Sequence, residues 1–183
     1  IFFRINYHKN LIELKLRTKN EDGLIFWLSN DSNTISDYIA LILIDGYLEF
    51  SFNLGIRSTY LSIRSSIKIN DGELHQVTLT RYENWFGYFI IKKIHWFIGI
   101  FFHRDKRIGT MEVDEKYMSS SLSQDGANEL NTNGKLWIGG CHSLPNGLTP
   151  AYYQNFIGCI EILKIEGILI INNVHNSFDC SFN

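Results

Sequence analysis

Residues 38–52 read Tyr-Ile-Ala-Leu-Ile-Leu-Ile-Asp-Gly-Tyr-Leu-Glu-Phe-Ser-Phe, and this stretch decides the fold class. An apolar run rich in isoleucine reaches Asp45-Gly46, and the residues after it alternate between apolar and polar. Asp-Gly suits a two-residue turn, because the tight turns that join twisted strands need φ angles above zero. The stretch therefore predicts a β-hairpin of two antiparallel strands.

Similar short apolar runs recur along the chain, and turn residues separate them. The runs cover residues 11–16, 24–28, 59–63, 76–81, 136–138 and 160–165, and the turns cover 21–23, 70–72 and 133–134. Nowhere does a helical period of apolar residues persist for three turns. This pattern predicts an all-β fold, an antiparallel β-sandwich or jelly roll whose two sheets pack face to face.

Composition excludes several classes of protein. The chain has 183 residues, of which 45% are hydrophobic, enough for one sizeable core. Lys and Arg number 17 against 19 for Asp and Glu, so no strong positive field favours nucleic acid. No run approaches the roughly 18 apolar residues that a transmembrane helix needs. Because the chain opens on Ile1 with no signal-peptide pattern, we expect a fragment of a longer protein.

A series of short motifs stands in a fixed order along the chain. They are Leu-Lys-Leu-Arg-Thr (14–18) with Asp-Gly-Leu-Ile-Phe (22–26), Asp-Tyr-Ile-Ala-Leu (37–41), Asn-Leu-Gly (53–55), Asp-Gly-Glu-Leu-His-Gln-Val (71–77), Leu-Trp-Ile-Gly-Gly (136–140) and Phe-Ile-Gly-Cys-Ile (156–160). In kind and order they resemble the laminin G-like (LNS) domain, and the resemblance covers residues 11–180 apart from one interruption. It implies a concanavalin-like jelly roll that serves as an extracellular adhesion or binding module and not as an enzyme.

The resemblance also implies covalent features of a secreted protein. In the family a cysteine at the position of Cys159 pairs with one near the end of the domain, and Cys180 is the candidate partner. Cys141 is then left over, either as a small buried hydrophobic residue or as a thiol that pairs between chains. Asn30-Asp31-Ser32 is a glycosylation sequon in a polar loop.

The family further implies a weak calcium site at one rim of the sandwich. The aligned ligands are the side chain of Asp37, the backbone carbonyl of Leu54, and the loop residues Glu129, Leu130 and Asn131. Calcium prefers oxygen ligands of all these kinds. Because laminin-like members carry a second Asp where Asn131 stands here, we expect an affinity no tighter than about 10⁻³ M. The alternative interpretation is that Asp37 merely caps the end of a strand.

The partners implied by the resemblance are of two kinds. Laminin-like members use the rim to bind the acidic glycan of dystroglycan, and neurexin modules use it to bind protein receptors on neurons. The basic residues expected near the rim are Arg57, Arg64 and Lys135, which is too few to decide between a glycan and a protein ligand. Either kind places the chain outside the cell, in the matrix or at the cell surface.

One segment, residues 86–108, interrupts the resemblance, and residues 1–10 fit it poorly. We therefore expect a single domain over 11–183 with an atypical insertion at 86–108 before a strand at Gly109–Asp114. The insertion is rich in Phe, Ile and Lys. Three interpretations remain open: a translated intron in a gene model, a genuine hairpin at a partner interface, or a segment that lies on a membrane surface.

The alternative function is that of a β-glucanase-like glycoside hydrolase, because such enzymes occur on related jelly rolls. These enzymes place catalytic carboxylates on one face of a strand. Glu112 and Asp114 would share a face of an extended strand, whereas Glu115 would point to the other. The spacing therefore argues against catalysis, and no nucleophile, phosphate-loop or dinucleotide motif is present in the sequence.

Overall fold

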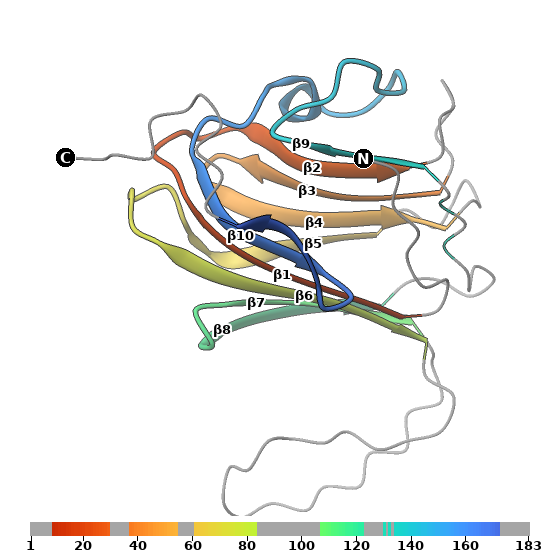
Figure 1. The fold of residues 1–183 in the computed structure, drawn as a ribbon, viewed down its shortest axis with the longest axis horizontal. Helices are drawn as coiled ribbons and strands as arrows, with labels where there is room; N and C mark the ends of the chain where they lie inside the picture. Colours follow the sequence, from red (N-terminus) through yellow and green to blue (C-terminus); the bar gives the residue numbers. More distant parts are fainter. Residues whose placement is uncertain are drawn as a thin grey trace, which may run out of the picture.

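The computed structural model describes residues 9–29, 37–54, 61–83, 107–122, 130, 132 and 134–172. These residues form a sandwich of two antiparallel sheets (Figure 1). One sheet contains β1 (Lys9–Arg17), β6 (His75–Glu83), β7 (Arg107–Val113), β8 (Tyr117–Leu122), β10 (Cys159–Ile165) and β11 (Ile168–Asn172). The other contains β2 (Gly23–Ser29), β3 (Tyr38–Ile44), β4 (Tyr47–Asn53), β5 (Leu61–Lys68) and β9 (Lys135–Ile138). The predicted all-β sandwich is confirmed.

The strand order places segments that are far apart in the sequence side by side, such as β1 beside β10 and β2 beside β9. The first sheet has the order β11-β10-β1-β6-β7-β8 and the second the order β5-β4-β3-β2-β9. A short 3₁₀ helix, η1 (Pro150–Tyr153), lies in the connection between β9 and β10. In the described part of the chain no helix is long and apolar enough to cross a membrane.

The hairpin of residues 38–52 forms as the sequence predicts. Strands β3 and β4 pair from Ile44↔Tyr47 at the turn to Tyr38↔Asn53 at the far end. Asp45 and Gly46 form the turn with φ angles of 52° and 80°. Both angles are positive, as a primed two-residue turn requires, so the chemistry of Asp-Gly fixes the register of this pair.

The main core lies between the two sheets and follows from alternation along each strand. From β1, the side chains of Ile12, Leu14 and Leu16 are at most 2% exposed. Across the sandwich, the rings of Phe50 and Phe52 on β4 pack against each other with centroids 5.6 Å apart. Full burial of each such side chain stabilises the fold by about 1.5–3 kcal/mol.

A second, smaller core lies on the outer face of the second sheet. Trp27 and Tyr38 stack with ring centroids 4.4 Å apart, and Tyr152 of η1 meets Trp27 edge-on at 6.0 Å. The hydroxyl oxygens of Ser51 and Tyr152 lie 2.6 Å apart in a buried position. The segment that carries η1 therefore covers β2 and β3 (Figure 1) and belongs to the core.

Several strand limits differ from those expected from sequence. Strand β1 begins at Lys9, before the expected domain start at residue 11. Strand β7 begins at Arg107, where it pairs with Glu83, so the last two residues of the expected insertion belong to a strand. The rest of the insertion, residues 86–106, and residues 1–8 lie outside the described part of the chain.

Strand β7 also ends before the carboxylate considered for catalysis. It stops at Val113, and Asp114 and Glu115 both have a φ of 55°, within the turn to β8. The expectation that Glu112 and Asp114 share one strand face was therefore wrong, because the chain turns between them.

Candidate functional site

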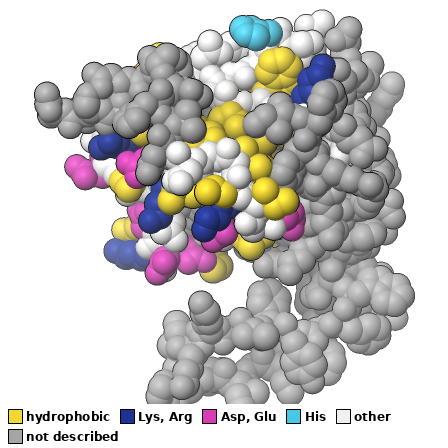
Figure 2. Space-filling model, in the orientation of Figure 1, with side chains coloured by type: hydrophobic (Ala, Val, Ile, Leu, Met, Phe, Trp, Pro, Cys, Tyr) yellow, Lys and Arg dark blue, Asp and Glu magenta, His cyan; other side chains and the backbone are white. Residues whose placement is uncertain are grey.

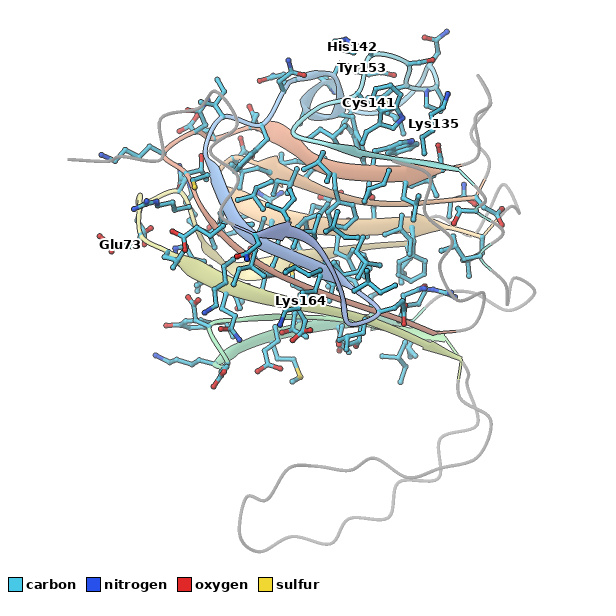
Figure 3. The ribbon with its side chains drawn as sticks, in the orientation of Figure 1. Glu73, Lys135, Cys141, His142, Tyr153 and Lys164 are labelled. Atoms are coloured by element: carbon cyan, nitrogen blue, oxygen red, sulfur yellow. The ribbon has the colours of Figure 1, made fainter. Side chains whose placement is uncertain are left out.

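The rim expected to carry the site is the end of the second sheet at which β3 begins and β4 ends. Tyr38 pairs with Asn53 on one side and with Ser29 on the other, and Ser29 also pairs with Lys135 at the start of β9. Residues that adjoin these positions therefore lie at one end of the sandwich. Figure 3 shows Lys135 at this end and Glu73 at the opposite one.

Asp37 and Leu54 both lie at this rim, as the sequence predicts. They directly adjoin the Tyr38↔Asn53 pair, the last pair of the hairpin at that end. The Asp37 side chain is buried, with an exposed fraction of 8%. Leu54 is 5% exposed and packs in the main core, so only its backbone can serve a ligand at the rim.

Two further polar side chains are buried near the same end, and sequence reasoning did not name either side chain as a ligand. Asn53 is 5% exposed and Thr132 is 1% exposed. Among the described residues, the Thr132 hydroxyl oxygen has no hydrogen-bond partner. A buried polar atom without a partner is costly, and carboxylate, amide and hydroxyl oxygens are ligands that suit calcium. The oxygen-bearing side chains at this end are therefore of the kinds that can ligate a calcium ion.

The other expected ligands cannot be placed. Glu129 and Asn131 lie outside the described residues, whereas Leu130 between them is fully buried in the main core. Among the described residues, no cluster of three or more His, Cys, Asp or Glu side chains could hold a metal ion. Asp37 is thus the carboxylate that the described residues offer at the rim.

Of the three basic residues expected near the rim, one lies elsewhere. Arg64 on β5 donates to the carbonyl oxygen of Ile44 and lies 3.6 Å from a carboxylate oxygen of Asp45. Its guanidinium group therefore faces the hairpin turn, away from the rim. Lys135 is at the rim, and Arg57 lies outside the described residues. On the face shown in Figure 2, basic and acidic side chains lie side by side.

The cysteines are placed in part. Cys159 is 4% exposed on β10, and its expected partner Cys180 lies outside the described residues, so the disulfide remains a prediction. Cys141 is half-buried and packs against the second core, with Sγ 3.6 Å from the carbonyl oxygen of Ser143. It is thus not fully buried, and both roles expected for it, a buried apolar residue and a thiol that pairs between chains, stay predictions. The sequon residue Asn30 lies outside the described residues.

The opposite end of the sandwich contains a histidine between two carboxylates. Nδ1 of His75 lies 2.7 Å from Oδ2 of Asp114, and Nε2 lies 3.0 Å from Oδ1 of Asp71. Burial alone would lower the pKa of His75, but hydrogen bonds and charge from Asp114 and Asp71 outweigh it and raise the pKa above its ordinary value of 6.5. The Asp114 carboxylate is thus held by the His75 ring and by the backbone amide of Gln76.

Asp71 responds to the same contacts. Burial would raise its pKa, but the backbone amide of Glu73 and the imidazole of His75 hold the pKa below its ordinary value of 3.8.

A second polar cluster joins the start of β1 to the β10–β11 turn. Nε of Arg81 donates to Oδ1 of Asn10 at 2.7 Å, and Nδ2 of Asn10 donates to Oε1 of Glu166 at 3.2 Å.

Comparison with known proteins identifies the family of this fold. A family model described as "Laminin G domain" matches residues 16–168. Human pikachurin is 27% identical over 180 residues, which cover 98% of this chain and 15% of that protein. The basement membrane proteoglycan of Caenorhabditis elegans is 23% identical over 160 residues, which cover 86% of this chain and 4% of that protein. The chain thus spans a small part of these relatives.

A solved structure agrees with the sequence comparison. The LG1–3 region of the laminin α2 chain matches 93% of this chain and 30% of its own length, with a TM-score of 0.70 and 18% identity. At that identity the likeness concerns the fold. The relatives include proteins of the extracellular matrix, among them the basement membrane proteoglycan and a laminin subunit.

Proposed function

This chain belongs to the laminin G domain family, and on that premise we propose that it is an adhesion module of a larger extracellular protein that binds its ligand at the rim beside Asp37. The observation that carries this proposal is the buried carboxylate of Asp37 at the strand end. A carboxylate oxygen is a hard ligand of the kind that calcium takes, and at this strand end it adjoins the same hairpin pair as the backbone of Leu54.

The cation best suited to these residues is calcium. Asp37 would provide the charged oxygen and Leu54 a backbone carbonyl, and Glu129 and Asn131 would provide a carbonyl and an amide oxygen from the neighbouring loop. Calcium takes about six to eight oxygen ligands. The protein offers fewer, so positions remain for water or for oxygens of a bound ligand. With Asn131 in place of a second carboxylate, the affinity should be weak, about 10⁻³ M.

The ligand that fits such a rim carries carboxylate or sulfate groups, either on an acidic glycan or on a receptor protein. An anionic oxygen can complete the calcium shell and neutralise its remaining charge. Lys135 adds a positive charge at the same end. The described rim lacks a larger basic cluster, so we expect the calcium ion, and not the protein surface, to supply most of the attraction.

The experiment that tests this function is binding of the full chain to an array of acidic and neutral glycans, in calcium and in EGTA. We expect retention on sulfated or carboxylated glycans in calcium and its loss in EGTA and in Asp37→Asn. Asp45→Asn is the matched control, because Asp45 is exposed and lies in the turn at the other end. Equal binding by Asp37→Asn and Asp45→Asn in calcium, or wild-type binding that persists in EGTA, would contradict a calcium-dependent rim site.

Two covalent features complete the proposal. A bridge between Cys159 and Cys180 would tie the end of the chain to β10, and closure of a loop of this length stabilises a fold by about 3 kcal/mol in the chain-entropy model. A glycan on Asn30 would lie in the loop before Asp37. Mass spectrometry of the secreted chain, with and without reduction and glycosidase treatment, tests both features.

A further inference from the structure

The cluster around His75 connects two parts of the chain that are far apart in sequence. Asp71 lies in the loop between β5 and β6, and Asp114 opens the turn between β7 and β8. His75, the first residue of β6, lies between them with a side chain that is 8% exposed. Each ring nitrogen lies within hydrogen-bond distance of a different carboxylate, at 2.7 Å and 3.0 Å.

The geometry defines the protonation state of the ring. An ionised carboxylate only accepts hydrogen bonds, and a neutral imidazole has one N–H donor and one bare nitrogen. Two carboxylates can therefore both be bonded only if both ring nitrogens carry protons. Both contacts are hydrogen bonds when His75 is an imidazolium ion between two ionised carboxylates.

Loss of one proton would break one of the two bonds, and the surroundings indicate which. Asp114 holds the ring at the shorter distance, 2.7 Å against 3.0 Å for Asp71. Asp114 accepts the Gln76 amide through its other oxygen, whereas Asp71 shares Oδ1 between the ring and the Glu73 amide. The Asp114 side chain is 35% exposed, against 55% for Asp71. The remaining proton therefore stays on Nδ1, facing Asp114. The bare Nε2 then faces Asp71, and two acceptors at this distance repel each other.

We propose that His75 is a proton-operated clamp: the imidazolium holds the loop of residues 69–74 against the β7–β8 turn, and deprotonation releases Asp71 and loosens this loop. Release is local, because other contacts persist. The amide of Gly72 donates to the carbonyl oxygen of Thr18 at 3.0 Å, and that of Ile69 donates to the carbonyl oxygen of Gly46 at 2.8 Å.

The other charged groups around the cluster are weaker influences. Lys19 packs along Gly72, and Glu73 is an exposed neighbour of Asp71 in the same loop. In the β7–β8 turn, Glu115 is exposed and bonds Gln76, and the ammonium group of Lys116 lies over the ring of Tyr117. These exposed charges are screened by water and salt. The two carboxylates in direct contact therefore decide the charge of the ring.

The stability of the protein should carry the signature of this clamp. Because the folded pKa of His75 is raised, its contribution to stability is fully present below pH 6.5, the ordinary value, and is lost as pH rises through the folded pKa. On the acid side, Asp71 with its lowered pKa contributes above its ordinary value of 3.8, and this part is lost as pH falls through its folded pKa.

The test is the thermal midpoint of the full chain between about pH 5 and pH 9, compared with two variants. In Asp71→Asn the amide can accept from a protonated ring or donate to a bare nitrogen, so the bond survives deprotonation. We expect the wild-type midpoint to fall across the His75 titration and this fall to be smaller in Asp71→Asn, in which Asp114 alone still favours the charged ring. Asp45→Asn is the control and should keep the wild-type slope.

A second readout follows the ring directly. Nitrogen NMR of the His75 side chain should show two protonated nitrogens at about pH 6 and a single proton, on Nδ1, after titration. Hydrogen exchange of the Glu73 amide, which donates to Asp71 Oδ1 at 2.8 Å, should lose protection over the same range after correction for the intrinsic rate. A neutral ring at about pH 6, or an Asp71→Asn variant with the full wild-type slope, would overturn the clamp.

Discussion

At the scale of single residues, the hydrogen bond between Ser51 and Tyr152 joins the second sheet to the segment that covers it. Both side chains are at most 1% exposed. Tyr152→Phe should destabilise the protein by about 1–3 kcal/mol, because it removes this partner from a buried hydroxyl. Urea unfolding followed by tryptophan fluorescence measures the change, since Trp27 packs against Tyr152.

The double variant separates this bond from general packing. If the two hydroxyls act together, Ser51→Ala combined with Tyr152→Phe should cost less than the sum of the two single changes, because neither hydroxyl is left alone. Additive costs would show that the 2.6 Å contact contributes nothing of its own.

Buried polar residues are the part of the structure that the sequence does not predict. Asn10 on β1 and Arg81 on β6 are each 1% exposed, although polar residues in strands ordinarily indicate a solvent-facing position. Thr132, which lies before β9, is also 1% exposed. Arg81 and Asn10 are buried as a pair, and their contact spans 71 positions of the chain. The pattern of apolar residues along one segment carries no information on pairings of this kind. The expected strand therefore began at residue 11, whereas β1 begins at Lys9.

At the scale of elements, the β3–β4 hairpin depends on Gly46. Its φ is 80°, and a Cβ atom there would lie 2.4 Å from Oδ1 of Asn70. Gly46→Ala should therefore cost the roughly 1–2 kcal/mol of a left-handed non-glycine residue and a further penalty from the collision. Gly147→Ala is the matched control, because its φ is 97° but nothing lies within 4 Å of the added atom.

Chemical denaturation of both variants distinguishes the two contributions. The structure requires Gly46→Ala to be the more destabilising of the pair. Equal losses of unfolding free energy would mean that Asn70 moves aside without cost. Backbone strain would then be the whole effect of a side chain at position 46. The m-values should match the wild type, because neither change alters the surface buried on folding.

The elements that the sequence predicts well are those with a local cause. The hairpin follows from Asp-Gly between two apolar runs, and its turn has the expected positive φ angles. The end of β7 was misplaced because Asp114 continues the alternating pattern, whereas its carboxylate bonds His75 and the Gln76 amide and so turns the chain. A tertiary contact overrides the pattern at that point.

At the scale of the whole molecule, the two ends of the sandwich differ in character. The rim brings together the ends of β2, β3, β4 and β9 with the buried carboxylate of Asp37. The opposite end is held by His75 between Asp71 and Asp114. The motifs predicted the family and placed Asp37 and Leu54 together, but Arg64 faces the other end because it bonds the hairpin turn. We infer that one end binds the ligand, and that at the other end His75 holds the loop of residues 69–74 against the β7–β8 turn.

The measurement that tests the central claim most directly is calcium titration calorimetry of the full chain beside Asp37→Asn and Asp45→Asn. We predict heat that saturates at about 10⁻³ M calcium in the wild type and in Asp45→Asn, and no saturable heat in Asp37→Asn. Circular dichroism confirms that each variant is folded. Saturable binding that survives in Asp37→Asn, or no binding by the folded wild type, would contradict the calcium rim.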